Sequence, residues 1–168
     1  PGEELHHDWQ ARKYRSMWGK NGYEFAMDKC THYAFAEPLK TEADSPKTMI
    51  KIIDRSLTLH GRHTARLAGD KSAVNTCTEI KQRMVKGGGV IFASNAGDKE
   101  QNGFIEANVK SHKRVVKCIE TQSNTKVFKP IWPKAVLHAV NIKNLWIRKG
   151  TDGVRTCPAA QWLGRNVD

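Results

Sequence analysis

Hydrophobic side chains recur at helical intervals through much of the first half of the chain. Between residues 3 and 20, Leu5, Trp9 and Trp18 fall near one side of a helix, and Asn21-Gly22 would end it. Between residues 23 and 37, the apolar positions repeat every three or four residues until Pro38. The pattern therefore predicts two helices, at residues 3–20 and 23–37.

A change of pattern follows the polar segment 39–47. Residues 48–54 are apolar and rich in β-branched side chains, which favours a strand. A further helix is predicted from Thr64 or Ser72 to Met84, and the three glycines at 87–89 would terminate it.

Beyond Gly89 the apolar positions fit a period of two, which indicates strands. Pro130 and Pro133 interrupt one of them and favour a place at a sheet edge. Residues 158–163, with proline first, predict a short terminal helix. The predicted strands cover residues 90–94, 104–109, 114–120, 127–132, 136–142 and 145–148.

Together these elements predict an α+β fold with helices mainly in the N-terminal half and an antiparallel sheet in the C-terminal half. The length of 168 residues suits one domain. Within it we expect a helical part at about 1–87 and a β-rich part at about 88–157.

Composition narrows the class of protein without naming a reaction. No apolar run approaches the roughly 18 residues that a membrane span needs. The four cysteines lie far apart without a Cys-x-x-Cys pair, which favours free thiols in a reducing intracellular compartment. The sequence indicates no cofactor and no metal, and it leaves the oligomeric state open.

Positive charge is concentrated in the second half of the chain. Residues 104–168 contain 12 Lys and Arg against 4 Asp and Glu, so this stretch carries +8 of the net charge of +11. Such an excess indicates a polyanionic partner. Nucleic acid, RNA or DNA, is the partner that we expect.

Basic and aromatic residues alternate in the same region, as expected of a surface that holds phosphates and stacks on bases. The segment that follows Trp9 adds further cations. The predicted contacts are Arg12, Lys13, Arg15, Lys110, Lys113, Arg114, Lys117, Lys126, Lys129, Trp132, Trp146, Arg148 and Lys149.

Two alternatives remain beside a binding protein that engages mainly phosphates. A small basic nuclease, of the toxin or effector type, could use histidine acid–base chemistry at His60, His63 or His112. For a metal-dependent nuclease, Glu79-Ile80-Lys81 has the Glu-x-Lys spacing but falls within a predicted helix where the motif should lie on a strand, and Glu106 with Lys110 has the wrong spacing. The other alternative is a viral or structural protein that packages nucleic acid.

Overall fold

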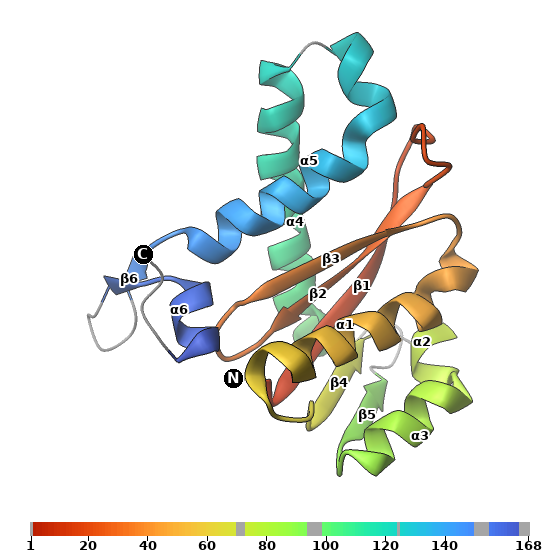
Figure 1. Cartoon of the computed structure of the whole chain (residues 1–168), viewed down its shortest axis with the longest axis vertical. Coiled ribbons are helices and arrows are strands. Elements are labelled where there is room, and N and C mark those ends of the chain that lie inside the picture. Colours follow the sequence, from red (N-terminus) through yellow and green to blue (C-terminus); the bar gives the residue numbers. More distant parts are fainter. Residues whose placement is uncertain (1, 70–72, 94–98, 124, 150–154, 165–168) are drawn as a thin grey trace.

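A central β-sheet with helices on both faces organises the computed structural model (Figure 1), which describes residues 2–69, 73–93, 99–123, 125–149 and 155–164. The sheet contains β1 (Glu4–Ala11), β2 (Gly22–Asp28), β3 (Ala34–Leu39), β4 (Arg66–Gly69) and β5 (Val90–Ala93). The helices are η1 (Glu42–Asp44), α1 (Ser45–His60), α2 (Ala73–Thr76), α3 (Thr78–Lys86), α4 (Lys99–Gln122), α5 (Thr125–Leu145) and α6 (Pro158–Leu163). A separate pair is formed by β6 (Arg148–Lys149) and β7 (Arg155–Thr156).

The five strands lie in the order β3-β2-β1-β4-β5. The first three form an antiparallel meander, with Asp8 opposite Phe25 on the neighbouring strand. Helix α1 then crosses over the sheet, so that β4 runs parallel to β1, and β5 runs parallel to β4. Strand β1 therefore lies at the centre, between the meander and the parallel pair.

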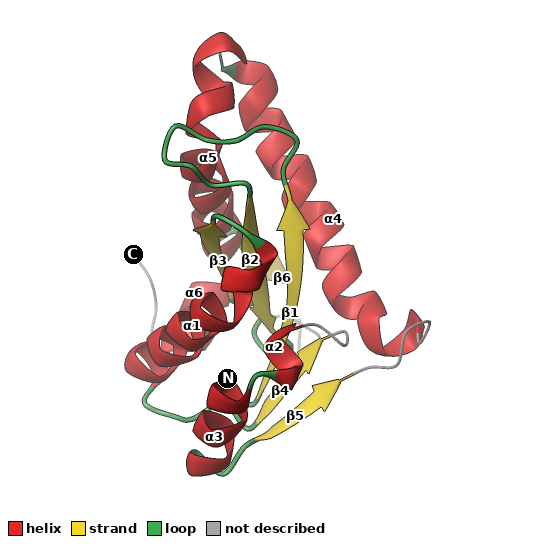
Figure 2. Ribbon diagram, turned by 90° about the vertical axis from the view of Figure 1, so that its right-hand side faces the viewer, coloured by secondary structure: helices red, strands yellow, loops and turns green. Residues whose placement is uncertain are grey.

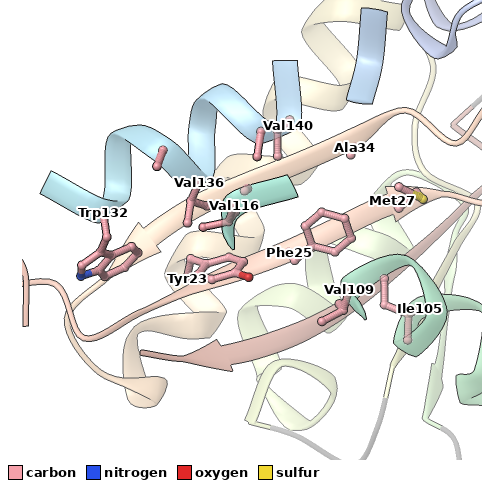
Figure 3. Packing of buried hydrophobic residues seen from close by; sticks show 13 residues of the cluster. Tyr23, Phe25, Met27, Ala34, Ile105, Val109, Val116, Trp132, Val136 and Val140 are labelled. Carbon is pink, nitrogen blue, oxygen red and sulfur yellow. The ribbon is translucent and has the colours of Figure 1, made fainter. Parts of the chain in front are cut away.

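Two hydrophobic clusters occupy the two faces of the sheet. On one face, Tyr23, Phe25 and Met27 of β2 pack against α4 and α5 (Figure 3). On the other face, Leu5, Phe35 and Leu67 pack against α1, α3 and α6. Figure 2 shows α4 beside β1, and α1 on the far side of the sheet.

The predicted layout of helices and strands was wrong, because the sheet is mostly N-terminal. The predicted helices at 3–20 and 23–37 are strands β1, β2 and β3. All seven residues of β2 are buried, since helices cover both faces of the sheet. A strand buried on both sides loses its apolar–polar alternation, and its apolar residues then also fit a helical period.

In the C-terminal half of the chain, most of the predicted strands are helices. The predicted strands at 104–109 and 114–120 belong to α4, and those at 127–132 and 136–142 belong to α5. Ile105, Val109, His112 and Val116 are buried at spacings of four, three and four, which is helical. Both Pro130 and Pro133 lie inside α5, whose cyan first turns run in a different direction from the blue remainder in Figure 1.

Residues 48–54, predicted as a strand, belong to α1. Met49, Ile52, Ile53 and Ser56 are buried along one side of this helix, so the helical spacing outweighs the β-branched composition. Gly61 ends the helix with a left-handed φ of 74°.

Other predictions were confirmed. Strand β5 matches the predicted strand at 90–94 over its described residues, and α6 covers 158–163 as predicted. Helix α3 covers part of the helix predicted to end at Met84.

Cys30, Cys77, Cys118 and Cys157 are all free thiols. Within the described residues, none of the helices combines the length and the apolar character that crossing a membrane requires.

Candidate nucleic-acid interface

Helix α4 presents a charged stripe opposite its buried stripe. Glu106, Lys110, Lys113 and Lys117 repeat the spacing of the buried residues one position later in the chain, and all four are exposed. Arg114 is exposed beside them. The same helical period that fixes α4 on the sheet therefore gathers its cations along one line.

Strand β1 supplies the opposite wall. Asp8 and Gln10 are two residues apart, so their side chains leave the same face of the strand, the face toward α4. The amide Nε2 of Gln10 donates a hydrogen bond to Oδ2 of Asp8 over 2.6 Å. This bond helps to fix the orientation of the carboxylate.

Two contacts fix how β1 and α4 run relative to each other. The His6 ring lies 4.9 Å from the Phe104 ring, centroid to centroid. Further along both elements, the Arg12 guanidinium forms an ion pair with Glu120. The strand and the helix therefore run side by side in the same direction, and Asp8 lies nearer to the Glu106 end of the interface.

A groove of about 430 Å³ runs between these two elements. Two carboxylates and four cations share it, together with one amide and one apolar side chain. Its lining consists of Asp8, Gln10, Glu106, Val109, Lys110, Lys113, Arg114 and Lys117. The groove can hold a phosphodiester backbone along its cations and bring one phosphate near the two carboxylates.

A second hollow, of about 310 Å³, continues the same interface. It lies further along β1 and α4, where the Arg12 guanidinium also stands 5.5 Å from the centre of the Trp132 ring. Its lining consists of Ala11, Arg12, Lys13, Tyr14, Glu120, Lys129 and Trp132.

The opposite face of β1 is fixed by a buried polar network. Nδ1 of His7 lies 2.9 Å from Oε1 of Glu24 on β2, and Nε2 of His7 lies 3.3 Å from Oδ1 of Asn75 on α2. Both His7 and Glu24 are almost wholly buried. The network joins β1, β2 and α2 behind Asp8, so the backbone that carries this carboxylate is held on both sides.

Many of the predicted binding residues come together. Lys110, Lys113, Arg114 and Lys117 line the groove, and Arg12, Lys13 and Lys129 line the second hollow. Arg15 is exposed in the loop that joins β1 to β2.

Other predicted contacts lie elsewhere. Trp132 lines the second hollow, but it is 1% exposed and its ring packs in the core, so we do not expect it to stack on a base. Trp146 follows the far end of α5, which is about 20 Å from Trp132 at 1.5 Å per residue. Arg148 and Lys149 form β6 beside Trp146, away from the groove. Lys126 belongs to α5, and its side chain lies outside the described residues.

The three candidate catalytic histidines occupy three separate places. His60 packs 5.3 Å from the Trp162 ring, and His63 lines a small cavity with Arg83 and Lys86. His112 is fully buried between Tyr23 and Phe25. Burial lowers the pKa of His112 to about 3, and the positive charges of Lys143, Arg12 and Lys113 act in the same direction. This ring stays neutral at pH 7.

Sequence reasoning missed Asp8, Gln10 and Glu106. Asp8 falls within the predicted helix at 3–20, and Glu106 falls within the predicted strand at 104–109. The helical spacing of Ile105, Val109, His112 and Val116 was the available signal, because it places Glu106 on the same stripe as the lysines.

Comparison with known proteins adds no family. No protein-family model matches the chain, and no curated protein matches its sequence significantly.

Proposed function

We propose that the protein binds nucleic acid in the groove between β1 and α4 and carries out divalent-metal-dependent phosphoryl transfer there, with hydrolysis of a phosphodiester bond as its simplest reaction. One observation carries the proposal: Asp8 and Glu106 share a groove whose other charged residues are all cations. The cations of the groove would be enough for nucleic-acid binding. The two carboxylates would repel a phosphate unless a metal cation lay between them and the phosphate.

The four cations hold the substrate through its phosphates. From Glu106 to Lys117, α4 extends about 16 Å at 1.5 Å per residue. That length corresponds to roughly five nucleotides at 3.4 Å each. Phosphate contacts set the position of the nucleic-acid strand but do not distinguish one base from another. We therefore expect the protein to bind many sequences.

The carboxylates would hold a metal ion such as Mg²⁺. Proteins commonly bind Mg²⁺ through one or two carboxylates, with substrate phosphate oxygens and waters as the other ligands. Within the described residues, no group of three or more His, Cys, Asp or Glu is arranged for a metal, so the substrate would complete this site. The ion would lower the pKa of a bound water and neutralise charge on the phosphate.

Hydrolysis then needs no further reactant. The water oxygen forms a bond to phosphorus, one P–O ester bond breaks, and the departing oxygen takes up a proton. The cations of α4 stabilise the added negative charge on the phosphate oxygens. Because Asp8 and Glu106 are supplied by the sheet and by a helix packed against it, their separation is fixed by the core.

Asp70 is the next carboxylate to test. It follows Gly69, the last residue of β4, and its own structure lies outside the described residues. Strand β4 runs parallel to β1, with Leu5 opposite Leu67 and His6 opposite Ala68.

The experiment measures binding and cleavage separately. Labelled RNA and DNA, single- and double-stranded, are incubated with Mg²⁺, Mn²⁺ or a chelator, and products are resolved on a denaturing gel. We expect metal-dependent cleavage that is lost in Asp8→Asn and Glu106→Gln, and Asp70→Asn is assayed beside them. Binding in the presence of chelator should survive in these variants.

The paired change Lys113→Glu with Arg114→Glu should abolish binding. Its matched control is Lys47→Glu with Lys51→Glu, which makes the same charge change on α1, on the other side of the sheet. Binding without cleavage under every metal condition would reduce the function to nucleic-acid binding. Equal loss of binding in both charge-reversed proteins would contradict the groove as the site.

A further inference from the structure

The loop between β1 and β2, residues 12–21, places aromatic rings at the surface beside the second hollow. Tyr14 is 43% exposed and Trp18 is 44% exposed, although both are large rings. Met17 between them is 66% exposed. Isolated exposed rings are ordinary on protein surfaces, but here the rings lie in one loop at the end of a cationic groove.

Lysine side chains flank both rings. Nζ of Lys129 lies 4.9 Å and Nζ of Lys13 lies 5.6 Å from the centre of the Tyr14 ring. Nζ of Lys134 lies 5.8 Å from the centre of the Trp18 ring. Each ring is thus paired with a positive charge, the combination that holds a base together with its neighbouring phosphate.

The loop is also held in a defined shape. The Ser16 N–H donates to the Lys20 carbonyl over 2.8 Å, and the Lys20 N–H donates to the Ser16 hydroxyl over 2.9 Å. Gly19 adopts a left-handed φ of 72°, which allows the chain to turn back.

Two hydrogen bonds attach the loop to α5. The Trp132 indole Nε1–H donates to the Tyr14 carbonyl over 2.9 Å, and the Met17 N–H donates to the Pro130 carbonyl over 2.8 Å. These bonds attach the loop to α5 at Tyr14 and at Met17. The rings are therefore presented by an ordered scaffold, so binding would cost little conformational entropy.

We propose that this loop, with the lysines at the start of α5, is a contact site for unpaired bases, so that the preferred substrate has a single-stranded segment next to the groove. The inference rests on the proposed function, because the bound nucleic-acid strand would reach the loop from the groove. The second hollow connects the two sites along β1 and α4.

The chemistry of stacking selects single strands. In a duplex each base is stacked on its neighbours and offers only its edges to a protein. An unpaired base exposes its faces, and Tyr14 and Trp18 can stack on them whatever the sequence. Lys13, Lys129 and Lys134 would hold the adjoining phosphates.

The test measures, by fluorescence anisotropy in the presence of chelator, the affinity of the protein for a single-stranded oligonucleotide of about 20 nucleotides and for the corresponding duplex. We expect the double variant Tyr14→Ala with Trp18→Ala to weaken single-strand binding by about tenfold or more, from the usual loss of stacking energy. Duplex affinity should change less than about twofold. Tyr14→Phe with Trp18→Phe should restore most of the single-strand affinity, since phenyl rings still stack.

Trp146→Ala is the matched control, because Trp146 is 59% exposed but lies at the far end of α5. It should leave both affinities unchanged. Unchanged single-strand binding in the alanine variant would overturn the inference, as would an equal loss on single strands and duplex. If the wild-type protein bound duplex and removal of the rings changed neither affinity, the groove would remain the proposed binding site and the proposal for the loop would be wrong. If wild-type protein bound neither nucleic acid, both proposals would fail.

Discussion

Asp8 of β1 and Glu106 of α4 line the same groove, although one belongs to the central strand of the sheet and the other to a helix that follows the sheet in the chain. Their approach depends on how α4 packs: the contacts of His6 with Phe104 and of Arg12 with Glu120 set helix and strand side by side. The proximity of the two carboxylates is therefore a consequence of the tertiary structure.

Binding to duplex nucleic acid should depend steeply on salt. If the four cations of the groove each neutralise one phosphate, a plot of log K against log salt should have a slope of about −3.6. Lys113→Gln should make that slope shallower by about one. Titrations between 50 and 200 mM salt, values chosen around the physiological range, measure it. Lys51→Gln on α1 should leave the slope unchanged, and a wild-type slope near zero would contradict phosphate binding.

Metal binding at the carboxylates should be visible without any substrate. A ligand that binds the folded state raises stability by RT ln(1 + [L]/Kd), which is about 1.4 kcal/mol at ten times Kd. For a chain of this length that corresponds to a rise in Tm of roughly 3–6 °C. We expect Mn²⁺ or Mg²⁺ to raise the Tm of the wild-type protein and to have less effect on Asp8→Asn or Glu106→Gln.

The control for this measurement is Glu79→Gln, which removes an exposed carboxylate on α3. Its Tm should respond to metal as the wild-type Tm does. An identical shift in all four proteins would mean that the metal acts elsewhere on the chain.

Burial of His112 should make the protein less stable in acid. Burial lowers the pKa of His112 to about 3. Between pH 6.5 and pH 3, His112 is therefore protonated in the unfolded chain and neutral in the folded chain. Stability from this residue is thus present above pH 6.5 and is lost as the pH falls, by about 1.4 kcal/mol per pH unit. Neither ring nitrogen has a hydrogen-bond partner among the described residues.

His112→Leu should remove this component, so its unfolding free energy should fall less steeply than that of the wild-type protein between pH 6 and pH 4, inside the window set by linkage. Urea unfolding at several pH values measures the difference. His138→Leu, at an exposed position on α5, should follow the wild-type curve. Parallel curves for His112→Leu and wild type would show that the folded and unfolded states protonate this ring equally, which would contradict the lowered pKa.

The close contact of Gly22 with Trp9 should make alanine costly at the base of the β1–β2 hairpin. A Cβ at Gly22 would overlap the Trp9 ring, so Gly22→Ala should destabilise the fold by about 1–3 kcal/mol in urea unfolding. A Cβ at Gly103 meets nothing within 4 Å, and this residue lies inside α4. Gly103→Ala should therefore stabilise the protein by about 0.5–1 kcal/mol. Equal effects of the two changes would contradict the packing at Trp9.

Some elements could be predicted from the sequence because local signals mark their ends, whereas others could not because burial or proline obscures their pattern. Helix α6, with Pro158 at its start, and strand β5, after three glycines, were predictable because local signals mark their ends. Strand β2 was not, because helices bury both of its faces and remove the alternation that identifies a strand. Helix α5 was not, because Pro130 and Pro133 usually exclude a helix interior.

The candidate site divides in the same way. The sequence by itself determined that the second half is strongly cationic, because charge is a sum over residues and needs no fold. It also supplied Lys110, Lys113, Arg114 and Lys117 as a cluster, since they are neighbours in the chain. Only the tertiary structure decided that Asp8 and Gln10 face those cations and that Trp132 and His112 are buried. Such proximity arises from the packing of α4 on β1, a long-range arrangement that local composition and periodicity do not encode.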